Sequence, residues 1–84
     1  MSEDTLDTAS SELKRVVEGN EVPQDVEESI QEAIDWLTGD GDPSDRAANA
    51  MNVLNDVSND PNIPMHIRTT LWNVSGDLES VSVE

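Results

Sequence analysis

The sequence predicts an all-α fold, an antiparallel four-helix bundle made of two αα-hairpins, and three observations lead to it. Proline, glycine and asparagine gather at EGNEVP, TGDGDP and SNDPNIP, which divides the 84 residues into four segments of helical length. Within each segment, apolar residues recur at spacings of three and four. The connections are short, so consecutive helices should run antiparallel and pack as one helical domain over residues 1–84.

The first two predicted helices cover about residues 4–18 and about residues 23–38. We expect Gly19 just after the end of the first helix, and Pro23 in the first turn of the second. The apolar side of the first helix is formed by Leu6, Ala9, Leu13, Val16 and Val17. The apolar side of the second helix is formed by Val26, Ile30, Ala33, Ile34 and Leu37.

The third and fourth predicted helices cover about residues 43–58 and about residues 64–81. Asp42 is the expected N-cap of the third helix, with Pro43 at its first position, and Pro64 lies in the first turn of the fourth. The third helix has the apolar positions Ala47, Ala50, Met51, Leu54 and Val57. The fourth has Ile67, Leu71, Val74, Leu78 and Val81.

The two halves of the chain resemble each other when one is shifted by 41 residues. The shift matches Pro23 with Pro64 and aligns apolar positions such as Leu13 with Leu54. This similarity has two interpretations, a duplication or two hairpins with similar buried positions. In both, each hairpin has an apolar side that it cannot bury alone, so the hairpins should pack against each other.

Charge is the strongest feature of the composition, because 19 acidic residues face one lysine and three arginines, for a formal net charge of -15. Such a surface repels nucleic-acid backbones, and we expect no direct binding to nucleic acid. Acid-rich, lysine-poor surfaces are typical of halophilic archaea, where a salt concentration of about 1 M shortens the Debye length to about 3 Å and screens self-repulsion. We therefore expect an acidic, folded, salt-dependent protein of a halophilic archaeon.

Other classes of protein are excluded or disfavoured by the composition. The absence of cysteine excludes disulfides and cysteine-based metal sites. No apolar run approaches the roughly 20 residues of a membrane span, and the acidic amino terminus is unlike a signal peptide. We therefore expect a cytoplasmic protein that does not bind a membrane.

The segment TGDGDPSDR places Asp40, Asp42 and Asp45 close together, as in the start of a calcium-binding loop. Counting from Asp40, the glycine position of an EF-hand holds Asp45, and the glutamate position holds Met51. The calcium motif fails. The segment is better explained as the end of one helix followed by the cap of the next.

His66 is the only histidine, so it is the obvious candidate for a metal or catalytic site. A carboxylate-bridged metal site in a bundle needs Glu-x-x-His pairs, and Ile63 stands where the glutamate would be. No serine lies in a nucleophile motif. We therefore assign no catalytic residue, cofactor, metal or small-molecule ligand, and expect an exposed or partly covered histidine.

Trp72 falls outside the buried side of the fourth helix. The residues that share its direction are Met65, Gly76 and Val83. One interpretation is a partner interface, since tryptophan and methionine are typical anchors, and a glycine permits close approach of another backbone. The other is that Trp72 folds over a neighbouring helix, as Trp36 would also do. The candidate interface consists of Met65, His66, Arg68, Trp72 and Gly76.

Arg68 also has two interpretations, because basic residues are scarce in this chain. It could be a buried or interfacial anchor for a carboxylate of the second helix or of a partner, using its planar guanidinium. It could equally be a surface charge, in which case its ion pairs would contribute only about 0–1 kcal/mol.

The stretch LNDVSNDPNIPMHIRTTLWNVSGDLE, residues 54–79, resembles the signature region of an archaeal family, uncharacterised protein family 0147. The resemblance extends more loosely over nearly the whole chain. It implies a compact four-helix bundle and an archaeal source, and it brings no reaction, cofactor or catalytic residue. The residues that match are Asn59, Asp60, Pro61, Asn62, Pro64, Met65, His66, Arg68, Trp72 and Asn73.

These observations favour a non-enzymatic module of unknown function that binds a protein partner or forms a homodimer through its fourth helix. An alternative is an accessory protein subunit of a ribonucleoprotein or other information-processing complex. A third hypothesis is a metal or enzyme site built from carboxylates around His66.

Overall fold

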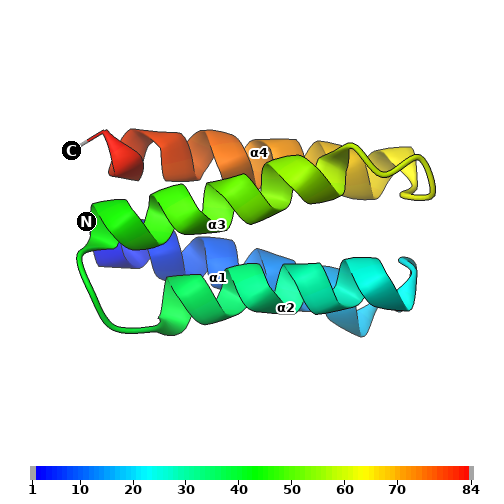
Figure 1. Cartoon of the computed structure of the whole chain (residues 1–84), viewed down its shortest axis with the longest axis horizontal. Helices are drawn as coiled ribbons and strands as arrows, with labels where there is room; N and C mark the ends of the chain where they lie inside the picture. Colours follow the sequence, from blue (N-terminus) through cyan, green and yellow to red (C-terminus); the bar gives the residue numbers. More distant parts are fainter. Residues whose placement is uncertain (1, 84) are drawn as a thin grey trace.

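The structure, a computed structural model, describes residues 2–83, and these residues form four helices and no strand (Figure 1). The helices are α1 (Ser2–Glu18), α2 (Gln24–Thr38), α3 (Pro43–Ser58) and α4 (Met65–Ser82). The predicted all-α class is confirmed. The observed bounds differ from the predicted ones by no more than two residues, which is the usual uncertainty of helix ends.

The four helices pack as a ring in which α1 and α3 each contact both α2 and α4. Each hairpin is closed by one corner, and Figure 1 shows both corners at one end of the bundle, with the two chain ends and the α2–α3 connection at the other. Consecutive helices therefore run in opposite directions, which confirms the antiparallel four-helix bundle made of two αα-hairpins. None of the described helices is long and apolar enough to cross a membrane.

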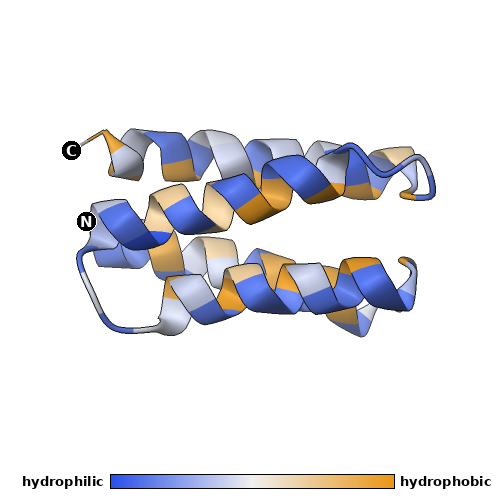
Figure 2. Cartoon of the chain, in the orientation of Figure 1, coloured by the Kyte–Doolittle hydropathy of each residue, from blue (hydrophilic) through white to orange (hydrophobic). Residues whose placement is uncertain are grey.

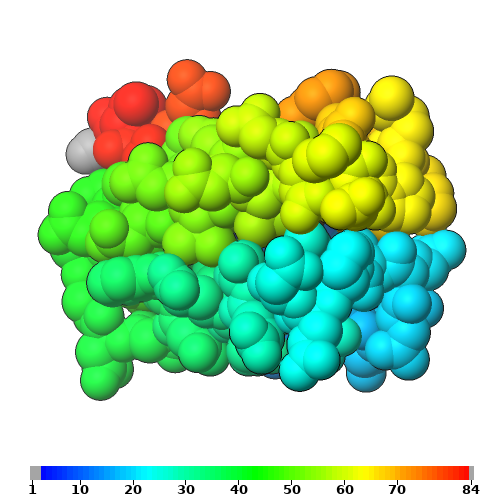
Figure 3. All heavy atoms as spheres, turned by 45° about the vertical axis from the view of Figure 1, so that its right-hand side comes forward, coloured from blue at the N-terminus to red at the C-terminus, as the bar shows by residue number. Residues whose placement is uncertain are grey.

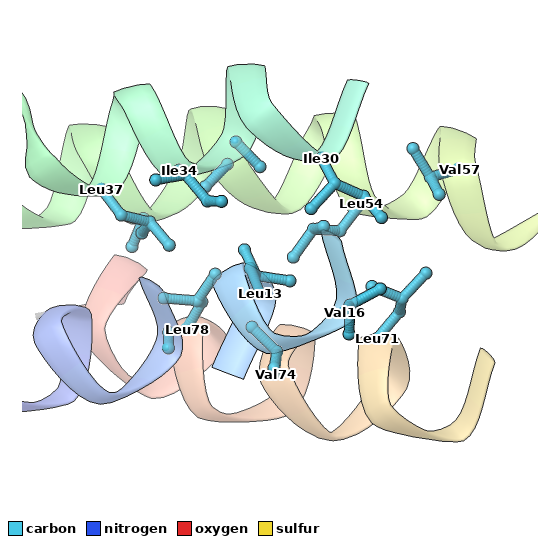
Figure 4. Packing of buried hydrophobic residues seen from close by; sticks show 14 of the residues in the cluster. Leu13, Val16, Ile30, Ile34, Leu37, Leu54, Val57, Leu71, Val74 and Leu78 are labelled. Carbon is cyan, nitrogen blue, oxygen red and sulfur yellow. The ribbon is translucent and has the colours of Figure 1, made fainter. Parts of the chain in front are cut away.

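The core is aliphatic and runs along the axis of the bundle (Figure 4). Almost every predicted apolar position is buried, and most polar residues face outward (Figure 2). Val17 and Met51 differ, because they lie at the edge of the core and are only partly buried. The largest fully buried side chains come from all four helices, so truncating one to alanine should cost about 2–5 kcal/mol. They are Leu6, Leu13, Ile30, Leu37, Leu54, Leu71, Leu78 and Val74.

The start of α3 follows the prediction. Pro43 occupies the first turn, and the backbone N–H of Ser44 donates to Asp42 Oδ1 at 2.9 Å. The Ser44 hydroxyl donates to the same oxygen at 2.9 Å. These two donors, the backbone N–H first, lower the pKa of Asp42 below its ordinary value of 3.8. Both hydrogen bonds of the cap therefore favour the ionised form of this carboxylate.

The α1–α2 and α3–α4 corners have the same backbone arrangement, an extended proline before the next helix, at positions 41 residues apart. Pro23 and Pro64 stand immediately before α2 and α4, with ψ angles of 157° and 149°. They are N-cap residues, one position before the first turn in which the sequence placed them. At the end of α1, Gly19 follows the last helical residue as predicted, and the next residue, Asn20, adopts the left-handed backbone, with φ of 54°. Asparagine is one of the few residues that tolerate this conformation.

Candidate interaction surface

The side of α4 that faces away from the core carries a second line of residues, which we name the outer α4 stripe. At about 100° per residue, these positions lie opposite the buried side of the helix. All of them are exposed, and the apolar members are unusually so: Met65 is 64% exposed, Trp72 54% and Val83 78%. The outer α4 stripe consists of Met65, Thr69, Trp72, Gly76 and Glu79, together with Val83, the C-cap residue of α4.

Trp72 has no carboxylate among its helical neighbours, whereas the other tryptophan does. No carboxylate stands three or four residues before or after Trp72, where helical neighbours lie. Trp36 is 42% exposed and lines a shallow hollow of about 280 Å³ together with Glu32 and Asp35. The bundle leaves more than half of Trp72 uncovered, so folding over a neighbouring helix accounts for only part of this side chain.

Gly76 has no packing role within the chain. A Cβ atom built on Gly76 would meet no heavy atom within 4 Å among the described residues. The close approach of another backbone, which was one reason to expect a glycine here, is therefore not made inside this molecule.

His66 lies beside the outer α4 stripe and is turned toward the other corner of the bundle. Its Nε2 atom lies 3.0 Å from Glu21 Oε2, and the two side chains are 64% and 51% exposed. The α1–α2 corner (cyan) and the α3–α4 corner (yellow) lie next to each other in Figure 3, so the pair joins them. In water such a pair contributes only about 0–1 kcal/mol.

Arg68 belonged to the candidate interface, but in the structure it stabilises the corner between α3 and α4. Its Nη2 atom donates to the backbone oxygen of Asp60 at 2.9 Å, in the corner between α3 and α4. The Asp60 carboxylate accepts the backbone N–H of Asn62 at 2.8 Å, which tightens the same corner. Within this chain the half-buried arginine is bound to a carbonyl and not to a carboxylate of α2, and it is not a fully exposed surface charge. The structure thus keeps Met65, Trp72 and Gly76 on one face and assigns His66 and Arg68 to the corners.

Arg46 is a residue that the sequence did not single out. It is only 8% exposed, donates from Nη2 to the backbone oxygen of Leu37 at the end of α2, and pairs with Glu3 Oε2 at 2.9 Å. It therefore ties the start of α3 to the end of α2 and to α1. Its Nε atom, like that of Arg68, is buried without a hydrogen-bond partner among the described residues.

A signal in the sequence could have identified both arginines. Each stands within the first four residues of its helix, where the positive end of the helix dipole disfavours a cation. A scarce arginine in that position indicates a partner elsewhere in the fold. Both find one in a backbone carbonyl, which Arg46 uses to satisfy one of the carbonyls left free at the end of α2.

A hollow of about 360 Å³ opens between α1 and α4. Its lining mixes carboxylates with one arginine and apolar groups, and no three His, Asp or Glu side chains of residues 2–83 converge as a metal site would require. The lining residues are Glu12, Arg15, Val16, Glu21, Ile67 and Thr70.

Comparison with known proteins relates the chain to archaeal sequences. A family model described as "Uncharacterised protein family (UPF0147)" matches residues 1–81. A UPF0147 protein of Archaeoglobus fulgidus is 39% identical over 84 residues, covering 100% of this chain and 97% of its own length. One from Methanothermobacter thermautotrophicus is 37% identical over 82 residues, covering 96% of this chain and 80% of its own length.

A third relative, from Methanosarcina mazei, is 38% identical over 73 residues and covers 86% of this chain and 78% of its own length. No solved structure matches the chain.

Proposed function

The chain belongs to the uncharacterised protein family UPF0147, and we propose that it is a non-enzymatic module that docks on a protein through the outer α4 stripe. The observation that carries the proposal is Trp72, which is 54% exposed and has no carboxylate three or four residues away on α4, in a chain of net charge -15. Tryptophan and methionine are among the residues enriched in the buried centres of protein interfaces.

The distribution of carboxylates supports docking on this face. Residues 61–76 contain no Asp or Glu, which is the longest such run in the chain. Exposed apolar residues are unremarkable when they are scattered, but Met65, Trp72 and Val83 share one side of one helix. A partner can cover them without desolvating a row of charges, which would be costly.

The arrangement around His66 supports a non-enzymatic role. Its partner Glu21 is half exposed, and the Thr70 hydroxyl, one turn further along α4, donates to the His66 carbonyl at 3.0 Å. A general base acts on a group within hydrogen-bond reach in a site that restricts water. The open His66–Glu21 pair has neither property.

The experiment is affinity capture from an archaeal lysate in molar salt, comparing the wild-type chain with Trp72→Ala. Trp36→Ala is the matched control, because it removes the other exposed indole from a different helix. We expect at least one protein to be recovered with wild type and with Trp36→Ala but not with Trp72→Ala. This protein can be another copy of the same chain.

The proposal is overturned if no recovered protein depends on Trp72. In particular, wild type, Trp72→Ala and Trp36→Ala could recover the same RNA-linked proteins in equal amounts. That result would favour the accessory-subunit alternative, which would then use a different surface.

A further inference from the structure

We propose that the partner of the outer α4 stripe is the same stripe of a second copy, paired antiparallel about a two-fold axis midway between Trp72 and Gly76. This inference rests on the proposed function and names its partner. It is drawn from the spacing, the side-chain sizes and the charges of the described residues of α4.

The first step is the spacing of the outer α4 stripe. Its six positions, 65, 69, 72, 76, 79 and 83, alternate steps of four and three residues. That alternation keeps side chains on one seam of a helix and is the spacing by which two helices pack in a coiled coil. The buried side of α4 already packs in the bundle, so the outer stripe is a second seam without a partner in the described chain.

The second step is that the stripe is complementary to itself in one antiparallel register. With the axis between Trp72 and Gly76, Met65 of one copy faces Val83 of the other, and Trp72 faces Gly76. Thr69 then faces Glu79. Every position meets another position of the stripe, and none is left over.

The third step is the size match between the two central residues. A glycine in a helix interior is about 0.5–1 kcal/mol less favourable than alanine, and the space around Gly76 is empty within the chain. In the proposed dimer, the indole of the partner copy fills that space, twice by symmetry. A parallel pairing would instead oppose two indoles and leave both glycines empty.

The fourth step is charge, because two chains of net charge -15 can meet only where carboxylates are few. The stripe holds one carboxylate, Glu79, and the antiparallel register places it opposite Thr69, whereas a parallel register would place it opposite itself. The positions that flank the seam hold no carboxylate at all. They are His66, Asn73 and Ser80 on one side, and Arg68, Ser75 and Ser82 on the other.

Only one helix from each copy supplies the contact, so the area buried in the dimer is smaller than the roughly 1,600 Å² of a standard interface. We therefore expect a reversible dimer that forms with rising protein concentration. Salt should tighten it, because the charges outside the seam still repel and are screened at high ionic strength.

The first test is sedimentation equilibrium over a range of protein concentrations in molar potassium chloride. We expect a monomer–dimer equilibrium, with the dissociation constant raised at least about tenfold by Trp72→Ala and unchanged by Trp36→Ala. Gly76→Ala should also weaken the dimer, because its methyl group meets the partner's indole. A chain that remains monomeric at every concentration overturns the inference, and the capture experiment then decides separately whether the stripe docks on a different protein.

The second test fixes the orientation and uses the fact that the chain has no cysteine. Thr69→Cys and Glu79→Cys are oxidised separately and as a mixture. Antiparallel pairing predicts a disulfide between the two variants in the mixture and none in Thr69→Cys alone, because a disulfide requires neighbouring Cβ atoms. Crosslinking of Thr69→Cys with itself would show a parallel pair. Dimers that form without any of these crosslinks would show that another surface is used. Both outcomes overturn the proposal.

Discussion

Arg46 and Arg68 show how single residues are used in a chain with few cations. Each is placed near the start of a helix, where the dipole disfavours it. Arg46 binds the carbonyl of Leu37 at the end of α2, and Arg68 binds that of Asp60 in the corner between α3 and α4. A charge-assisted hydrogen bond to a buried carbonyl is about twice as strong as a neutral one. These residues therefore fix how successive helices meet.

The first prediction at this scale concerns the buried arginine of α3. Arg46→Met keeps most of the side-chain volume but leaves the carbonyl of Leu37 without its donor, so the free energy of unfolding should fall by about 1–3 kcal/mol. Urea denaturation in molar salt measures this change. Arg15→Met is the control, because it alters the net charge equally at an exposed site. Equal losses in the two variants would contradict the assigned role.

A second prediction follows from the lowered pKa of Asp42. Because the folded pKa lies below the unfolded value, the cap contributes its full stability above about pH 3.8 and loses it as the pH falls through the folded pKa. Asp42→Asn keeps an acceptor for the Ser44 N–H without titrating.

The measurement is the thermal midpoint of wild type and Asp42→Asn between pH 6 and about pH 2. We expect the wild type to lose stability relative to the variant only in the acid limb, below the ordinary aspartate pKa. Asp40→Asn, an exposed aspartate two residues earlier, is the control for the loss of one charge. Parallel curves for wild type and Asp42→Asn would show that the cap does not need its charge.

At the scale of elements, α4 differs from the other three helices because more than one large apolar residue is exposed on its outer side. Its buried side closes the core, and its outer side holds Met65, Trp72 and Gly76. The other exposed tryptophan, on α2, stands among carboxylates. The outer side of α4 is thus the part of the surface that can be covered at the lowest electrostatic cost.

Substituting alanine at Gly76 and at Gly41 should change the unfolding free energy in opposite directions. Gly76→Ala should raise the unfolding free energy of the monomer by about 0.5–1 kcal/mol, because the space is open and alanine is the better helix former. Gly41→Ala should lower it, because φ at this position is +118°. Thermal unfolding at low protein concentration tests both. A Gly76→Ala variant that is less stable as a monomer would show a packing role that the structure does not contain.

At the scale of the whole molecule, charge is unevenly distributed between the two hairpins. Thirteen of the 19 acidic residues precede Pro43, so the first hairpin carries most of the self-repulsion. Carboxylates four residues apart on one helix, such as Glu28 and Glu32, also repel each other. The fold should therefore depend on ions that screen these charges.

We predict that helicity and the thermal midpoint rise from dilute buffer to molar potassium chloride, as measured by circular dichroism. For a domain of this size, each 1 kcal/mol gained raises the midpoint by about 4–8 °C. A Glu28→Gln, Glu32→Gln variant should need less salt, because it removes two of the repelling charges of α2. Helicity and a midpoint that are already complete at low salt would refute the expected salt dependence.

The sequence by itself determined the four helices, their order and almost all of the core. Helix starts and ends depend on neighbours in the chain, such as Asp42 with Ser44, and the apolar spacing fixes which side of each helix is buried. It also placed Trp72 and Met65 outside the core, where the structure leaves them exposed.

Only the tertiary structure decided which polar groups meet. Arg46 and Glu3 are 43 positions apart, and His66 and Glu21 are 45 apart, so no local pattern joins them. The same holds for the empty space beside Gly76, which depends on where the neighbouring helices lie. The physical reason is range: capping and periodicity act within a few residues, whereas these contacts exist only after the two hairpins have packed together.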